Sequence, residues 1–241
     1  TELKYLDCSY NCLSNLDMSK NIKLEKLYCW CNGLKNLDLN NTIALTSLNC
    51  AANPLNNLDV SKSIKLKELS CYSNKLTSLD ISKNIELTSL NCNDNLLLDL
   101  EMSKNENTKL EELLCTDNLL TNLDLSKNIE LKVLDCSYNQ IASLNMSENI
   151  NLTNLSCSYN EINNLNLTNN IELVGLYCHS NQLTNLDLTK NIALIKLTCV
   201  GNQLTNLDIS KSIKLTELYC YGNQLTNLDL TNNINLIQID C

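Results

Sequence analysis

Cysteine is the residue whose type and spacing most directly suggest chemistry in this chain. Ten of the eleven gaps between regularly placed cysteines are 21 residues long, and one is 23. The regular positions are Cys8, Cys29, Cys50, Cys71, Cys92, Cys115, Cys136, Cys157, Cys178, Cys199, Cys220 and Cys241. Such thiols can pair as disulfides, bind metal ions, or serve as small buried hydrophobes.

The elements that position these thiols follow from the repeat itself. Counted from Leu3, the 21-residue unit reads L-x-x-L-x-C-x-x-N-x-L-x-x-L-D-L-S-K-N-I-x. A repeat of this length predicts a solenoid, in which each copy forms one coil and stacked copies bury a continuous core. Positions 1, 4, 6, 11, 14, 16 and 20 are apolar in most copies. We expect all seven to belong to that core.

The segment around each cysteine predicts a β-strand. In x-L-x-C-x, apolar and variable residues alternate, which is the period of a strand with one buried face. Asp, Ser and Asn crowd positions 15 to 19, where their side chains compete with helical hydrogen bonds. We therefore predict a mainly β solenoid with a parallel sheet on its concave side. Extended or turn-like chain, or short second strands, would form the convex side.

In-register strands decide between the interpretations of the cysteines. Such strands lie ~4.8 Å apart with parallel Cβ vectors, and the Cβ spacing then exceeds the usual ~3.5–4.5 Å of a disulfide. Zinc requires convergent ligands, not a line of parallel ones. The cysteines are thus predicted to be buried hydrophobes. Cys12 and Cys31 are extra cysteines in adjacent copies, and a bond or a metal site between them stays open.

Two polar columns accompany the cysteines. An asparagine stands at position 9, from Asn11 to Asn223, and its amide can donate to and accept from backbone groups of its own and the neighbouring coil. A carboxylate stands at position 15 in most copies, from Asp17 through Glu101 to Asp229. Aligned carboxylates favour calcium, but Asp also caps turns, and lysine at position 18 offsets the charge. We favour turn capping.

Aromatic residues mark the candidate binding surface. All ten of them and the single histidine fall on positions 3, 5, 7 and 8 of the repeat. They are Tyr5, Tyr10, Tyr28, Trp30, Tyr72, Tyr138, Tyr159, Tyr177, His179, Tyr219 and Tyr221. Tyrosine also suits exposed strands and stabilises cross-strand pairs, but exposed Tyr and Trp are the residues that anchor partners. Together with Asp94 and Asp117, we predict that this set binds a ligand on the concave face.

Acidic residues share these four positions. They are Asp7, Glu68, Asp94, Glu112, Asp117, Asp135, Glu217 and Asp240, opposed only by Lys26 and Lys196. The formal net charge of the whole chain is −9. Complementarity therefore predicts a neutral or basic ligand surface, with association that weakens as salt is added.

The strand segment resembles a known family. Residues 131–141, L-K-V-L-D-C-S-Y-N-Q-I, match the signature of bacterial leucine-rich repeat proteins. The 21-residue length, the strand cysteine and the LD-L-S/T-x-N half are similar to repeats of the internalin family. The resemblance implies a curved, right-handed leucine-rich repeat superhelix. It also implies a secreted or wall-attached adhesin that binds host proteins or glycans on its concave face.

The resemblance covers the whole chain and sets the expected domain organisation. We expect residues 1–241 to form a single leucine-rich repeat domain of eleven full repeats and the start of a twelfth. No cap precedes Thr1 or follows Cys241, and terminal repeats with polar outer faces are normally needed for solubility. We therefore expect a fragment of a longer protein that lacks both caps.

Composition argues against several classes of function. His179 has no nucleophile beside it in a pocket, so we predict that the segment is not an enzyme and needs no cofactor or metal. The chain lacks the basic stripe of a nucleic-acid-binding protein and has no apolar run of about 20 residues that would insert into a membrane.

Three functions then remain: a protein-binding adhesin module, a glycan- or mucin-binding module, and a structural spacer. We expect an extracellular or cell-surface location from the resemblance. A cytoplasmic location also stays open, because buried thiols fit either compartment.

Overall fold

The computed structural model describes residues 2–100, 102 and 107–241. It contains two compact units, Thr1–Leu120 and Thr121–Cys241, which are described in turn as unit 1 and unit 2. Within the described residues the chain forms strands, turns and bends, and it contains no α-helix. The prediction of a mainly β solenoid is confirmed.

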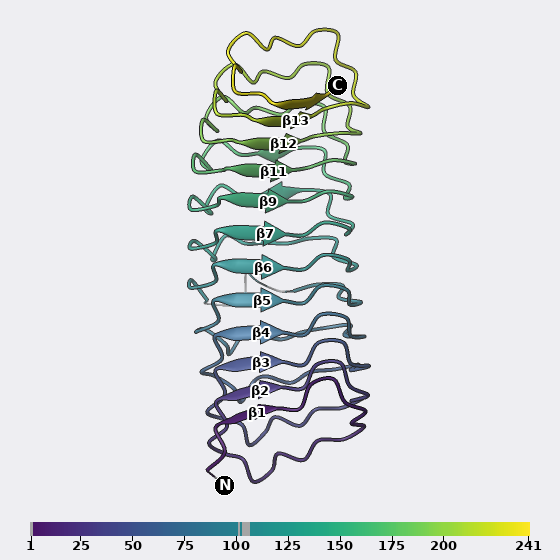
Figure 1. Ribbon diagram of the computed structural model, residues 1–241, viewed down its shortest axis with the longest axis vertical. Helices are drawn as coiled ribbons and strands as arrows, with labels where there is room; N and C mark the ends of the chain where they lie inside the picture. The colour runs from purple at the N-terminus through teal and green to yellow at the C-terminus, as the bar shows by residue number, and fades with distance from the viewer. Residues whose placement is uncertain (1, 101, 103–106) are drawn as a thin grey trace. The chain divides into compact units, whose positions relative to one another are not determined.

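Unit 1 is built around a parallel sheet that takes one short strand from each repeat. The strands are β1 (Tyr5–Asp7), β2 (Lys26–Tyr28), β3 (Ser47–Asn49), β4 (Glu68–Ser70), β5 (Ser89–Asn91) and β6 (Glu112–Leu114). They lie side by side in sequence order (Figure 1). Residues at the same repeat position face each other, as Leu6 faces Leu27 and Leu27 faces Leu48. Each repeat position thus becomes a column of side chains.

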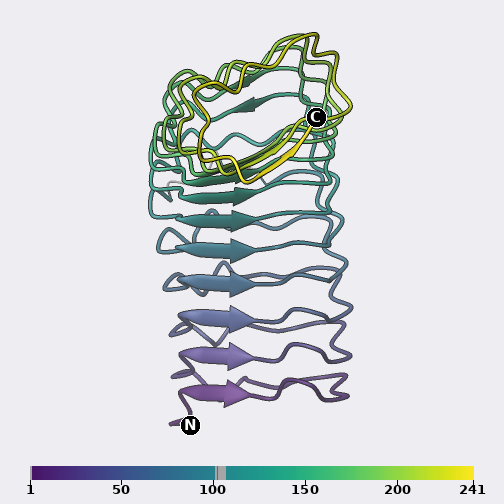
Figure 2. The ribbon, with the colours of Figure 1, turned by 45° about the horizontal axis from the view of Figure 1, so that its top comes forward.

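Unit 2 repeats this arrangement and adds a second, smaller sheet. Its main strands are β7 (Val133–Asp135), β9 (Asn154–Ser156), β11 (Gly175–Tyr177), β12 (Lys196–Thr198), β13 (Glu217–Tyr219) and β14 (Gln238–Asp240). The second sheet pairs β8 (Leu144–Asn145) with β10 (Leu165–Asn166). Figure 2 shows this pair in teal, across the coil from the main sheet. The predicted short second strands are therefore present in unit 2.

The 23-residue spacing leaves the sheet of unit 1 intact. β5 and β6 pair in register across it, with Ser89 opposite Glu112 and Leu90 opposite Leu113. The longer spacing predicts a two-residue bulge on the side away from the strand, but residues 103–106 of this segment lie outside the described part of the chain. Asn107, which ends this segment, is buried and donates its amide N–H to the Leu87 carbonyl at 2.7 Å.

The core contains six of the seven predicted positions. Leucine, isoleucine, valine or methionine at positions 1, 4, 11, 14 and 16 and cysteine at position 6 are buried in the central repeats. The prediction for position 20 is wrong, because isoleucines from Ile22 to Ile213 are 44–57% exposed. The turns explain this result: Asn21 N–H donates to the Met18 carbonyl and Leu24 N–H to the Asn21 carbonyl. These bonds turn the residue at position 19 inward and leave the residue at position 20 outside.

The asparagine column at position 9 has the predicted structural role. The amide of Asn53 donates to the carbonyls of Cys50 at 3.1 Å and of Cys29, in the preceding coil, at 3.1 Å. Its oxygen accepts the backbone N–H of Leu34 at 3.0 Å. Each such side chain therefore joins two coils, since backbone groups buried without partners would destabilise the fold.

A second asparagine column lies at position 19 and was not foreseen. Asn84 is fully buried and donates to the carbonyls of Val60 at 3.1 Å and Ser63 at 2.9 Å. Asn170 makes the same pair of bonds to Met146 and Asn149. From the sequence, position 19 was expected to lie in a turn. In the structure its side chains form a buried polar column beneath the exposed isoleucines.

Candidate ligand-binding face

The strands place the predicted site residues on one face of the sheet. Position 4 leucines such as Leu27 and Leu176 are fully buried, so positions 3 and 5 of the same strands point to the opposite face. Tyr5, Tyr28, Tyr177 and Tyr219 occupy these outward positions, and all four are exposed or half-buried. We call this surface, made of positions 3, 5, 7 and 8, the sheet face.

In unit 1 the aromatic residues form two ring pairs. Tyr5 packs edge-on against Tyr28, with ring centroids 5.6 Å apart, and Tyr10 packs against Trp30 at 4.1 Å. Both distances suit aromatic pairs. Tyr72 is half-buried and, in the part of the chain that the structure describes, joins neither pair. Four of the five predicted aromatics of unit 1 are thus brought together.

In unit 2 a continuous stack forms. Tyr138 and Tyr159 are nearly parallel, with ring centroids 4.3 Å apart, and Tyr159 meets His179 edge-on at 5.0 Å. Ser158 Oγ lies 2.7 Å from Nδ1 of His179, within hydrogen-bond distance, and so holds the imidazole in place. Tyr177, Tyr219 and Tyr221 line the same face outside this stack. We call Tyr138, Tyr159 and His179 the aromatic stack.

The Ser158–His179 contact corrects the expectation that His179 has no serine beside it. The two residues share position 7 of neighbouring repeats, so the 21-residue spacing carried this signal. Burial lowers the pKa of His179, which favours the neutral imidazole. Ser158, however, is only 3% exposed, so its hydroxyl lies beneath the surface where a substrate would bind. The contact with Ser158 orients the imidazole ring.

Position 8 carries an unusual backbone. Its residue has positive φ in every described repeat from Tyr10 to Gly222, including φ 54° at Tyr138 and 53° at Tyr159. Glycine adopts this conformation without strain, whereas a side chain with a Cβ costs about 1–2 kcal/mol there. Gly201 and Gly222 were the sequence signal for this conformation. Tyrosine at position 8 therefore opposes the preference of the backbone.

The predicted acidic residues also lie on the sheet face. Asp94 and Asp117 are exposed at position 8, again with positive φ, and Asp94 accepts a 2.6 Å hydrogen bond from Ser73 Oγ. Glu68 and Glu112, which were counted as charges but not as site residues, accept bonds from Ser47 and Ser89.

These two glutamates open onto a shallow depression. It has a volume of about 520 Å³, with Tyr28 at its wall. Unit 1 thus has an acidic surface with an aromatic border.

In unit 2 some of the sheet-face charge is neutralised. Lys196 Nζ lies 2.8 Å from Glu217 Oε1 on the neighbouring strand. Asp135 accepts the backbone N–H of Ser137 at 3.0 Å and so also caps the turn that follows its strand. The acidic character of the sheet face is therefore stronger in unit 1.

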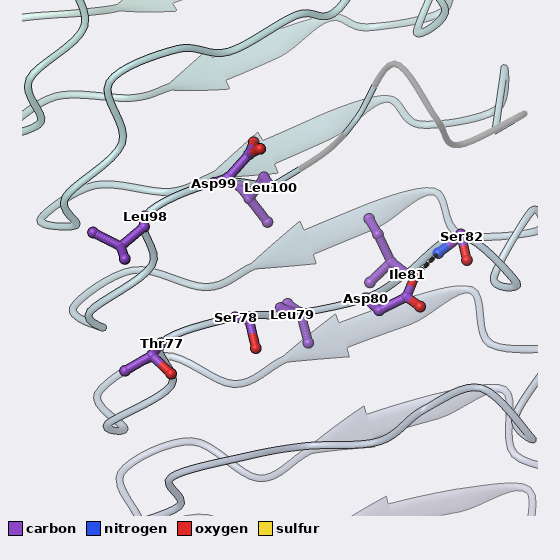
Figure 3. A pocket seen from close by; sticks show the side chains of 9 residues that line it. All are labelled: Thr77, Ser78, Leu79, Asp80, Ile81, Ser82, Leu98, Asp99 and Leu100. Atoms are coloured by element: carbon purple, nitrogen blue, oxygen red, sulfur yellow. Dashed lines mark hydrogen bonds between the residues drawn. The ribbon is translucent and has the colours of Figure 1, made fainter.

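A separate groove lies away from the sheet in unit 1. It has a volume of about 530 Å³ and is lined by Thr77–Ser82 and Leu98–Leu100, whose side chains Figure 3 shows. Asp80 is occupied in capping its own turn, because the Ser82 N–H donates to it at 2.8 Å. None of the predicted site residues lines this groove.

The carboxylates at position 15 are turn caps, as expected. Each accepts the backbone N–H two residues later at 2.8–3.0 Å. Asn145 and Asn166 make the same bond with an uncharged oxygen. Glu101 lies outside the described residues. Among the residues that are described, no cluster of three metal-ligating side chains occurs.

This capping predicts a loss of stability in acid. The backbone N–H of Ser210 lowers the pKa of Asp208 below its ordinary value, and Asp17, Asp80 and Asp124 are lowered by the equivalent N–H. A carboxyl with a depressed folded-state pKa stabilises the fold above its unfolded pKa of about 3.9, and this stabilisation is lost as pH falls through the folded value. We expect the melting temperature to fall steeply between about pH 4 and pH 2.

Thermal melts from pH 5 downwards check this expectation. Asp208→Asn keeps the acceptor, as Asn145 and Asn166 do, and should have a smaller acid-induced drop than the wild type. A melting temperature that is constant from about pH 5 to pH 2 would contradict the prediction.

The cysteine column consists of buried thiols. Cys29, Cys50 and their equivalents up to Cys220 are buried cysteines that form no disulfide. Burial raises the pKa of Cys29 and Cys92 to about 12, so the reactive thiolate is suppressed. Cys12 is exposed and Cys31 is half-buried, and both are free thiols. The prediction of small buried hydrophobes is confirmed for this column.

The sequence matches no protein-family model and no curated protein. Among solved structures, the functional domain of InlJ from Listeria monocytogenes, which includes a cysteine ladder, is 42% identical, with a TM-score of 0.94. The match covers 99% of this chain and 53% of that one. The chain is a leucine-rich repeat protein with repeats of the internalin type. It spans about half the length of its listerial relative.

More distant leucine-rich repeat proteins share the fold alone. InlF, an internalin from Listeria monocytogenes, is 22% identical, with a TM-score of 0.78, over 93% of this chain and 76% of its own. The ectodomain of the receptor kinase GASSHO1/SCHENGEN3 from Arabidopsis thaliana is 21% identical, with a TM-score of 0.71, over 91% and 32%. That ectodomain was solved in complex with CASPARIAN STRIP INTEGRITY FACTOR 2. The leucine-rich repeat sheet is thus shared from bacteria to plants.

The repeats of this chain differ from one another mainly on the sheet face. Leucines, cysteine and both asparagine columns hold the coils together, so the fold leaves positions 3, 5, 7 and 8 free to vary. Within the part of the chain that the structure describes, no helix has the length and apolarity to cross a bilayer.

Proposed function

We propose that this chain is the protein-binding module of a bacterial cell-surface or secreted adhesin. Its ligand would be held on the sheet face. The observation that carries this proposal is the position of Tyr138 and Tyr159, which occupy left-handed backbone sites and nevertheless stack at 4.3 Å. Strained residues persist where function requires them, and exposed tyrosines anchor protein partners.

The comparisons support the class of function. InlJ and InlF carry the same fold, and the plant ectodomain was solved in complex with CASPARIAN STRIP INTEGRITY FACTOR 2. Leucine-rich repeat solenoids offer an extended sheet surface for such binding. On this basis we place the protein outside the cell or on its surface, and we propose that residues 1–241 act as one leucine-rich repeat domain.

We further propose that the module is not an enzyme. Catalysis needs a reachable nucleophile, a base and a stabilising pocket. The sheet-face histidine pairs with a buried serine, and the groove of unit 1 away from the sheet contains hydroxyls and carboxylates without an imidazole or a thiol. A binding function needs none of these parts, only shape, rings and charge.

Side-chain deletion on the sheet face tests the proposed function. The variant in which Trp30, Tyr72, Tyr177 and Tyr221 are changed to alanine should keep the fold and lose at least about tenfold in binding to target cells, since each is an exposed or half-exposed anchor. The fold is checked by circular dichroism and melting, and binding by flow cytometry of labelled protein.

A matched variant keeps this test specific. Thr77, Thr121, Thr184 and Thr205 are exposed at position 12, away from the sheet, and their change to alanine should leave adhesion intact. Equal adhesion of both variants would show that these four side chains are not anchors and would favour a spacer. Retention on a glycan array, without capture of any protein, would instead favour a glycan ligand.

A further inference from the structure

The exposed isoleucines of unit 1 form a second surface that the proposed function does not use. Ile22, Ile43, Ile64 and Ile85 are each about half exposed, at 47–56%. They occupy position 20 of four consecutive repeats, just before the strands. Because the repeats stack in register, these side chains follow one another along the edge of the coil. We call this row the isoleucine flank.

The isoleucine flank contains an apolar groove. Ile22, Ile43, Ile64 and Ala44 line a cavity of about 670 Å³. Contiguous exposed apolar surface is uncommon on soluble proteins and usually marks an interaction site. The buried half of each side chain contributes to stability, but that contribution does not account for a groove that crosses three repeats.

Lysines surround the isoleucine flank. In the described part of unit 1, the adjoining positions 18, 21 and 2 and their equivalents carry eight lysines and four glutamates. The lysines are Lys4, Lys20, Lys23, Lys62, Lys65, Lys67, Lys83 and Lys109, and the glutamates are Glu2, Glu25, Glu86 and Glu111. The flank is thus net positive, although the whole chain has a charge of −9.

Two of the lysines at the groove are available to a partner. Lys4 pairs with Glu25 and Lys23 with Glu2, each at 2.8 Å. Lys62 and Lys65 line the same groove and, among the described residues, have no carboxylate within ion-pair distance. The groove therefore combines an apolar floor with a net positive lining of four lysines against Glu2 and Glu25, and it suits an acidic partner that also has apolar contact area.

The sheet face of unit 1 has the complementary chemistry. Its charged groups are Asp7, Glu68, Asp94, Glu112 and Asp117, against Lys26 alone. Its apolar contact area comes from the ring pairs Tyr5–Tyr28 and Tyr10–Trp30. The isoleucine flank is basic and aliphatic, and the sheet face of unit 1 is acidic and aromatic. The two surfaces are therefore complementary in charge, and both offer apolar contact area.

We propose that the isoleucine flank of one chain docks on the sheet face of a second copy of this chain. This inference rests on the proposed function, because it assigns the sheet face a protein ligand of stated chemistry. The contact joins two different surfaces, so it is heterologous and leaves one free surface at each end of the assembly. An anionic bilayer is the less favoured partner, because the flank glutamates and the net charge of −9 oppose it.

Sedimentation velocity of the full 241-residue chain, over a range of protein and salt concentrations, tests the proposal. The wild type should self-associate at low salt and dissociate as salt is added. The flank variant Lys62→Glu/Lys65→Glu and the face variant Asp94→Lys/Asp117→Lys should each self-associate at least about tenfold more weakly.

Mixing the two variants provides the decisive result. Each variant keeps the surface that the other has lost, so the mixture should associate again, as only a heterologous contact permits. Lys35→Glu/Lys75→Glu makes the same charge change away from the flank and should self-associate at least as well as the wild type. All six substituted residues are exposed, so the variants should fold.

Three outcomes would overturn the inference. The first is that the wild type sediments as a monomer under all conditions. The second is that the mixed variants do not associate. The third is that vesicles with anionic lipid bind the flank while the protein remains monomeric. If the wild type is monomeric but its sheet face still binds target cells, only this inference fails. If neither the four aromatic substitutions nor loss of the Tyr138 and Tyr159 rings weakens cell binding, the proposed function fails instead.

Discussion

Replacing Asn160 by alanine should lower the free energy of unfolding by about 2–4 kcal/mol, since several buried backbone groups lose their partner at once. The Asn160 amide donates to the carbonyls of Cys136 at 3.0 Å, Cys157 at 3.1 Å and Ser158 at 3.2 Å. Its oxygen accepts the Ile141 N–H at 2.9 Å. Alanine leaves these backbone groups buried without a hydrogen-bond partner.

Urea denaturation followed by circular dichroism measures this effect. Asn185→Ala, at an exposed position of the neighbouring repeat, is the matched control and should change the free energy by less than about 0.5 kcal/mol. A loss at Asn160 no larger than that of the control would show that the position 9 column does not hold the coils together.

The second large effect is expected at the aromatic stack. Changing Tyr138 and Tyr159 together to glycine should weaken binding of the ligand by roughly thirtyfold or more, if each ring is an anchor. The variant should nevertheless remain folded, because glycine adopts the positive φ of these positions without strain. Loss of the ring stacking and release of the strain, each about 1 kcal/mol, should nearly cancel.

A comparison of glycine with alanine separates strain from binding. Tyr159→Gly should be more stable than Tyr159→Ala by about 1 kcal/mol, because only alanine carries a Cβ in the left-handed region. At Tyr177, in strand β11, the order should reverse, since glycine weakens a strand interior. The same order at both positions, measured by thermal unfolding, would contradict the strained backbone at position 8.

Position 20 shows where sequence reasoning failed. An isoleucine that recurs in ten copies of a repeat is expected in the core, and its hydrophobicity does not indicate that it is exposed. The turn bonds that join position 19 to position 16 and to the first position of the next repeat decided the outcome, because they direct the asparagine of position 19 inward. Since isoleucine can line a core or a partner groove equally well, its direction depended on backbone geometry.

Position 8 and position 7 show two further limits. Gly201 and Gly222 indicated a left-handed residue, but tyrosine, aspartate and serine in other copies concealed it. The Ser158–His179 contact was accessible from spacing, since both residues occupy one column. The Tyr10–Trp30 and Tyr159–His179 contacts join different columns, and such diagonal contacts depend on how neighbouring coils are offset.

The sequence by itself determined the solenoid, its sheet, the buried cysteines, the structural asparagine column and the turn-capping aspartates. It could do so because an exact repeat turns each position into a column, and one rule for that column then holds in every coil. Only the tertiary structure decided which way the isoleucine at position 20 points, which tyrosines have a strained backbone and which rings contact each other. These features depend on dihedral angles and on contacts between coils, which residue type and spacing do not encode.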